Sequence, residues 1–168
     1  MMLIEAMKEL KVIEKKMTKN CASITEYAAC PDNERLPFGD KAAQAKEVRG
    51  LIQSNGDLLQ RYLELKKKIE RTNLETVVEV NGVRYTISDL LVLKRKLAKQ
   101  MVQTYNALND GQARNKVAQM RRGQGEKEPI VEKFYDERDK VAGIREWDDL
   151  YHAIDSRLEV INATTPLI

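Results

Sequence analysis

The side chains of this chain that could carry out acid–base or metal chemistry are few and isolated. His152 is the single histidine, and its neighbours in the sequence supply neither the nucleophile nor the orienting acid that a catalytic triad needs. Asp148 and Asp149 could bind a metal ion, but on a charged helix we interpret them as solvated carboxylates. We therefore predict no catalytic residue and no metal site, and we expect the protein not to be an enzyme.

The two cysteines, Cys21 and Cys30, are separated by eight residues and have no histidine nearby, which excludes a zinc motif. We interpret them as two reduced thiols in a loop, although they could form a disulfide in an oxidising compartment. The chain contains no Gly-x-Gly-x-x-Gly, P-loop or His-Glu-x-x-His motif, so we expect no cofactor.

A polar, glycine-containing segment at residues 112–129, predicted to be a basic loop or a short frayed helix, is the strongest candidate for binding. Its cations are Arg114, Lys116, Arg121 and Arg122, and arginine forks bind phosphate or carboxylate through paired hydrogen bonds. Tyr85 and Tyr105 could add stacking surfaces. A solvated run of charge is the alternative. The net charge of +3, from 29 basic and 26 acidic residues, argues against a dedicated nucleic-acid protein. A small anionic, nucleotide-like ligand is the better prediction.

Composition predicts that long helices with narrow apolar seams position these residues, because 33% of the chain is charged and only 5% is aromatic. Apolar residues from Leu3 to Met17 recur at spacings of three and four, which predicts a first helix ending near Lys19. Residues 20–39 are predicted to be a loop. Asp40 is the expected N-cap of a second helix that reaches Arg71 and completes a helical hairpin over residues 1–71.

The second helix has heptad spacing. Its seam positions are Val48, Leu51, Asn55, Leu58, Tyr62, Leu65 and Ile69. Asn55 is the polar exception. It either finds a partner inside the seam, where it would fix the register, or it faces a loop or water beside Gly56.

Residues 74–87 predict a β-hairpin. Asn81 and Gly82 can adopt the two positive φ angles of a type I′ turn. That turn would pair Val80 with Val83, Glu79 with Arg84 and Val78 with Tyr85. An isolated hairpin is marginally stable, so we expect its apolar face to rest on a helix or on another chain.

Two further helices are predicted after the hairpin. A capping box at Thr86 and Asp89 opens a helix over residues 88–110, with a stripe at Leu90, Leu93, Leu97, Met101, Tyr105 and Leu108. An apolar patch at residues 130–135 predicts a strand or the start of a helix. The final helix, residues 140–162, has its seam at Ile144, Trp147, Tyr151, Ile154, Leu158 and Ile161.

Three segments together resemble one family. They are Ile69-Glu-Arg-Thr-Asn73, the stretch from Asn81-Gly82 to Leu91 with Lys94 and Arg95 behind it, and the tail from Asp155 to Leu167. They are similar to the septicolysin-like family of small bacterial and phage proteins, and the order of elements matches over nearly the whole chain. The cysteine-containing loop and residues 112–128 depart from this similarity. The resemblance implies an α-rich fold with a small β element and transfers no catalytic set.

The combined prediction is one mainly α-helical domain over residues 1–168, with coiled-coil-like antiparallel helices and a central hairpin. We expect a homo-oligomer whose seam includes Asn55, Tyr62, Trp147 and Tyr151 and whose basic inter-subunit cleft captures the anionic ligand. A structural protein, such as a phage particle component that docks partner chains, is the alternative, and a hydrolase is a distant third. Residues 1–10 contain Glu5 and Glu9 and lack the apolar segment typical of a signal peptide, and no apolar run approaches the roughly 20 residues that span a bilayer. We therefore expect no membrane association and a location in the bacterial cytoplasm or a phage particle.

Overall fold

A computed structural model describes residues 1–120 and 129–168 of the chain. Within this part the fold is mainly helical, and a two-stranded antiparallel hairpin is its only sheet, so the predicted fold class is confirmed. By their internal contacts the residues form two compact units, 1–76 with 160–168 and 77–159. A single domain can contain two such units, and the prediction of one domain over residues 1–168 stays a prediction.

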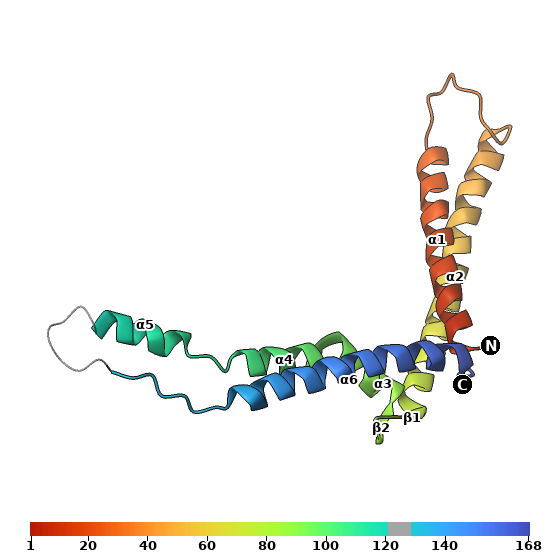
Figure 1. Cartoon of the computed structure of the whole chain (residues 1–168). Coiled ribbons are helices and arrows are strands. Elements are labelled where there is room, and N and C mark those ends of the chain that lie inside the picture. The colour runs from red at the N-terminus through yellow and green to blue at the C-terminus, as the bar shows by residue number, and fades with distance from the viewer. Residues whose placement is uncertain (121–128) are drawn as a thin grey trace. The chain divides into compact units, whose positions relative to one another are not determined.

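The first unit is built on two long antiparallel helices, α1 (Leu3–Tyr27) and α2 (Lys41–Glu75), which lie side by side (Figure 1). α1 is longer than predicted, and residues 20–27 are helical rather than part of a loop. The reason is that Ile24 and Tyr27 continue the three–four spacing of the apolar seam. Cys21 therefore lies on a helix, and the connecting loop is confined to residues 28–40.

The ends of α2 are held by specific hydrogen bonds. Asp40 is the N-cap, as predicted, and its Oδ1 accepts a hydrogen bond of 2.8 Å from the Ala43 amide. The helix continues beyond the predicted end at Arg71 because Thr72 is buried inside this unit. The Thr72 hydroxyl donates to the Lys68 carbonyl and accepts from the Ile168 amide at 3.0 Å. The C-terminal tail is thereby fixed to α2.

The hairpin consists of β1 (Val77–Val80) and β2 (Val83–Thr86), and the predicted register is confirmed. Asn81 and Gly82 have φ angles of +50° and +79°, as a type I′ turn requires. The strands are shorter than the predicted span of 74–87, because residues 74 and 75 belong to α2 and residue 87 begins the next helix. Its apolar face is only partly covered, since Val80 is buried whereas Val83 is exposed.

The helix predicted over residues 88–110 is interrupted. It comprises α3 (Ile87–Val92), the π-helical turn η1 (Leu93–Leu97) and α4 (Ala98–Asn106). The predicted capping box is present, and the Thr86 hydroxyl accepts a hydrogen bond from the Asp89 amide at 3.0 Å. Leu97 is 41% exposed and Ala98 only 1%, so the predicted stripe is wrong at this point. A π-turn takes up one extra residue, and this moves the buried position by one along the chain.

The segment predicted as a basic loop or a short frayed helix, 112–129, begins as a helix, α5 (Gly111–Met120). Residues 121–128 lie outside the described part. The apolar patch at 130–135 forms neither the strand nor the helical start that we predicted, and it follows an irregular path. Ile130 is 87% exposed and Phe134 is 95% exposed, so these side chains find little to pack against within the described residues.

The last helix, α6 (Glu137–Thr164), contains the predicted span of 140–162. It lies beside α4 (Figure 1). The contact is close at Gly143, where an added Cβ would stand 2.3 Å from a ring carbon of Tyr105. Glycine at this position lets a large aromatic ring approach the helix backbone.

Candidate ligand-binding groove

The residues predicted to bind a ligand do not form one site. Arg114 and Lys116 lie on α5, Tyr85 on β2 and Tyr105 on α4. Arg121 and Arg122 lie outside the described residues. Tyr105 packs against Gly143, and Tyr85 is half-buried opposite Val78 in the hairpin. The cavity beside Arg114 is lined by Asp110, Arg114, Val117, Ala118, Pro129, Ile130, Val131 and Lys133. It includes neither tyrosine.

Arg114 already has a protein partner. Its Nη2 lies 2.9 Å from Asp110 Oδ2, and Lys133 Nζ approaches the same oxygen at 3.6 Å. The hydrogen bond from Arg114 holds the pKa of Asp110 below its usual range, although partial burial of the carboxyl opposes this effect. The side chain of Asp110 is only 18% exposed. This cluster connects the start of α5 to the segment before α6.

A different group of cations shares a groove with aromatic rings. The cationic groove is a cavity of about 350 Å³ between the η1–α4 segment and α6. Its lining residues are Lys94, Arg95, Ala98, Lys99, Val102, Trp147, Asp148 and Tyr151. One wall carries three cations, and the other carries two aromatic rings and a carboxylate. Ala98 is buried at the floor.

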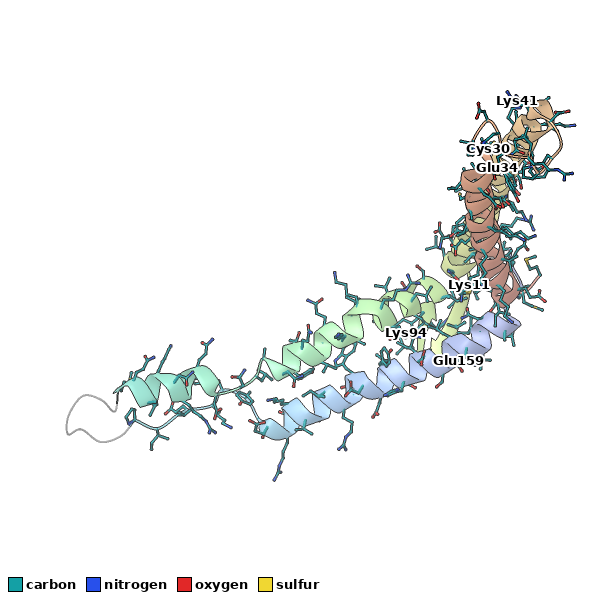
Figure 2. All side chains as sticks on the ribbon, turned by 90° about the horizontal axis from the view of Figure 1, so that it is seen from above. Lys11, Cys30, Glu34, Lys41, Lys94 and Glu159 are labelled. Carbon is teal, nitrogen blue, oxygen red and sulfur yellow. The ribbon has the colours of Figure 1, made fainter. Side chains whose placement is uncertain are left out.

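Lys94 is held in place by an ion pair with Asp155 of α6. Figure 2 shows Lys94 on the side of its helix that faces α6. The hydrogen bond to Asp155 raises the pKa of Lys94, and partial burial works against that rise. Lys94 therefore remains charged at neutral pH, and its ammonium group is held by Asp155, which is not among the lining residues of the groove.

Arg95 and Lys99 lie on the same wall, and both are exposed. Among the described residues, neither forms an ion pair with a carboxylate within 4.0 Å. Their charges can therefore bind an anion without first breaking a salt bridge. Asp148 on the opposite wall disfavours an anion that reaches that side. An anionic group would thus bind at the η1–α4 wall.

A π-turn lies within this cationic wall. η1 contains Leu-Lys-Arg-Lys-Leu, and the Ala98 amide donates to the Leu93 carbonyl five residues earlier. The wider turn offsets Lys94 and Arg95 relative to Lys99, and π-turns of this kind are frequent at functional sites. We predicted a regular helix here and did not identify the groove. The available signal was the cluster of Lys94, Arg95 and Lys99 on a helix next to an aromatic seam.

The predicted seam residues of α2 have partners within their own chain. Asn55 Oδ1 accepts a hydrogen bond from Asn20 Nδ2 at 2.9 Å, so Asn55 lies inside the α1–α2 seam with a partner. Tyr62 donates to Glu14 Oε1 at 2.9 Å, and this bond raises the pKa of Tyr62. Trp147 and Tyr151 lie in the cationic groove. A role for these four residues between subunits stays a prediction.

The remaining candidates for chemistry are exposed. His152 lies edge-on to Tyr151, with ring centroids 5.6 Å apart, and Cys21 and Cys30 are free thiols. Residues 1–120 and 129–168 contain no group of three or more His, Cys, Asp or Glu side chains placed to hold a metal ion. Each helix in these ranges is too short or too polar to cross a bilayer.

The chain matches no family model, no curated protein and no solved structure. The resemblance to the septicolysin-like family therefore stays a prediction.

Proposed function

We propose that this protein captures a small anionic ligand that carries an aromatic ring, such as a nucleotide, in the cationic groove. The observation that carries this proposal is the position of Arg95 and Lys99, which have no ion-pair partner among the described residues, opposite Trp147 and Tyr151 in one cavity. A phosphate can bind the cations, while a base stacks on an aromatic ring. The volume of about 350 Å³ is at the small end of the range for ligand pockets, roughly 300–1,000 Å³.

The proposed role is capture rather than catalysis. The lining residues of the groove include cations, aromatic rings and one carboxylate, and none of them is a Ser, Thr, Cys or His. Such a set supplies binding contacts for an anion and an aromatic ring, and it lacks the hydroxyl, thiol or imidazole of the Ser–His and Cys–His pairs of many hydrolases. The proposal keeps the predicted ligand class and moves its site from the basic segment to the groove.

Trp147 is the only tryptophan of the chain, so its fluorescence reports directly on the groove. We expect at least one member of a panel of linear and cyclic nucleotides to quench it in a saturable way. Adenosine and ribose 5-phosphate, which each carry half of the recognised features, should bind more weakly. If no member of the panel changes the fluorescence or produces heat in calorimetry, the proposal is wrong.

The double variant Arg95→Ala with Lys99→Ala tests the cationic wall. Each lost charge-assisted hydrogen bond costs roughly 1.5–3 kcal/mol, so affinity should fall at least about tenfold. Lys15→Ala with Lys16→Ala makes the same change in net charge on an exposed face of α1 and should leave affinity unchanged. Arg114→Ala with Lys116→Ala tests the segment that the sequence favoured. An equal loss of affinity in the α1 control would mean that binding follows total charge and not the groove.

A second candidate function, the docking of partner chains in an assembly, rests on a separate observation. Met120, Ile130 and Phe134 are large apolar residues that are 62%, 87% and 95% exposed among the described residues, and an exposed apolar surface is typical of a protein–protein contact. The double variant Ile130→Ser with Phe134→Ser should abolish incorporation into larger particles without lowering the melting temperature. Unchanged incorporation would exclude this surface as the docking site.

A further inference from the structure

The tip of the α1–α2 hairpin contains a second cavity, of about 520 Å³, in the first unit. It lies between the end of α1, the connecting loop and the first turns of α2. Figure 2 labels three of its lining residues, Cys30, Glu34 and Lys41, at this tip. None of these residues belongs to the cationic groove, so the cavity is an independent site.

Several contacts fix the walls of this tip cavity. The rings of Tyr27 and Phe38 meet edge to face, with centroids 5.0 Å apart. Gln44 Nε2 donates to the Tyr27 carbonyl at 2.9 Å and so connects α2 to the end of α1. The loop also contains two tight turns, closed by the Glu34 amide on the Pro31 carbonyl and by the Gly39 amide on the Leu36 carbonyl. These contacts give the loop a defined conformation on its side of the cavity.

The charges of the tip cavity are separated by wall. The loop wall contributes two carboxylates, Asp32 and Glu34, and the α2 wall contributes two cations, Lys41 and Arg49. Within the described part of the chain, none of these four side chains forms an ion pair within 4.0 Å. Opposite charges thus line the same cavity without neutralising each other.

The surface between these charges is apolar. It is formed by small and aliphatic side chains of both helices and the loop, among them Ala28, Leu36, Ala45 and Val48. A simple anion would meet the two carboxylates, and a simple cation would meet Lys41 and Arg49, so each is disfavoured on one side. A molecule with both charges and a short apolar group can pair its positive charge with the loop carboxylates and its negative charge with the α2 cations, and its apolar group can contact the surface between them.

We propose that the tip cavity binds a small zwitterion with an aliphatic side chain, the chemistry of a free apolar amino acid. Its carboxylate binds at Arg49, its ammonium group at Asp32 and Glu34, and its side chain contacts Ala45 and Val48, while Lys41 adds positive charge to the same wall. Charge-assisted hydrogen bonds at both ends give the site its direction.

Cys30 lines the cavity and provides a built-in reporter, and Cys21, which is also exposed but is absent from the lining, provides an internal control. The full-length protein is alkylated with iodoacetamide in the presence of leucine, and the rate at each cysteine is measured by mass spectrometry. At a leucine concentration of about ten times Kd, alkylation of Cys30 should slow roughly tenfold, in proportion to one plus the ratio of ligand concentration to Kd. Alkylation of Cys21 should be unchanged.

Two analogues and two variants test the charge assignment. Leucinamide lacks the carboxylate and 4-methylpentanoate lacks the ammonium group, so each should protect Cys30 several-fold less than leucine. Arg49→Gln and Asp32→Asn should each reduce protection by leucine to the same degree. Equal alkylation of Cys30 with and without leucine, equal slowing at both cysteines, or equal protection by all three compounds would each overturn the proposal. In the Arg95→Ala with Lys99→Ala variant, leucine should protect Cys30 as well as it does in the wild type, because neither residue lines the tip cavity.

Discussion

At the scale of single residues, a polar pair, Asn20 and Asn55, connects the two helices inside the α1–α2 seam. Asn20 Nδ2 donates both to Asn55 Oδ1 at 2.9 Å and to Ser54 Oγ at 3.2 Å. A half-buried amide that has a partner costs little, whereas an amide that loses its partner is destabilising. The pair is therefore best tested by changing one member and then both.

We expect Asn55→Leu alone to lower the free energy of unfolding by about 1 kcal/mol, because Asn20 keeps only its weaker partner. Asn20→Leu with Asn55→Leu should recover or exceed wild-type stability, since both polar groups then leave the seam. Urea unfolding of the two single variants and the double variant measures this coupling. Additive losses in the double variant would show that the two amides do not act as a pair.

Asp110 is the second residue whose role can be tested, through pH. Its pKa in the folded protein is lowered, mainly by the hydrogen bond from Arg114, so its contribution to stability is fully present above the ordinary aspartate pKa. That contribution is lost as the pH falls from about 4 through the lowered value. The melting temperature of the wild type should thus be higher than that of Asp110→Asn at neutral pH. The difference between the two melting temperatures should shrink below about pH 4. A difference that is independent of pH would mean that the charge of Asp110 does not matter.

At the scale of elements, the packing of α4 on α6 depends on a missing side chain. An added Cβ at Gly143 would stand 2.3–2.7 Å from three atoms of the Tyr105 ring, so the ring must move if any other residue is present. Helix propensity favours alanine over glycine. For Gly143→Ala, propensity therefore predicts a gain in the free energy of unfolding, whereas packing against Tyr105 predicts a loss.

We expect the packing cost to exceed the gain from helix propensity, so that Gly143→Ala lowers the free energy of unfolding by about 1–3 kcal/mol. Gly50→Ala is the matched control, because Gly50 lies within α2 and a Cβ there would meet nothing within 4 Å. That variant should gain roughly 0.5–1 kcal/mol from propensity alone. Chemical denaturation of both variants gives the comparison, and a gain at both positions would show that Tyr105 moves aside at little cost.

At the scale of the whole molecule, apolar surface left uncovered within one chain favours association between copies. Ile52, Leu59 and Leu63 are about half exposed and recur along α2 at spacings that place them on one face. Val83 is half exposed on the hairpin. Neither surface belongs to the seam between α1 and α2.

We therefore expect sedimentation at micromolar concentration to show an oligomer. Gly82→Val should dissociate it, because a β-branched residue at a φ of +79° costs on the order of 1–3 kcal/mol and distorts the hairpin. Gly50→Ala should sediment like the wild type. A clean wild-type monomer would end this prediction, and a normally assembled Gly82→Val variant would show that the hairpin is not at the interface.

The ends of the helices and the hairpin turn could be predicted from sequence because their interactions join residues that are only a few positions apart in the chain. Asp40 bonds to the Ala43 amide, Thr86 and Asp89 bond to each other, and the Asn81–Gly82 turn sets its own φ angles. The end of α1 was missed because the prolines and glycine further along suggested a loop too early. In fact the seam continues through Ile24 to Tyr27.

Only the tertiary structure decided which side chains share a site. Lys94 meets Asp155, and Arg95 and Lys99 share a groove with Trp147, although α4 and α6 are separated by α5 and an irregular segment. The π-turn moves the buried position from Leu97 to Ala98, and the spacing of apolar residues in the sequence does not predict this shift. Hydrogen bonds within a helix depend on nearest neighbours, whereas a groove depends on how two distant helices pack, and that packing is set by contacts such as Tyr105 on Gly143.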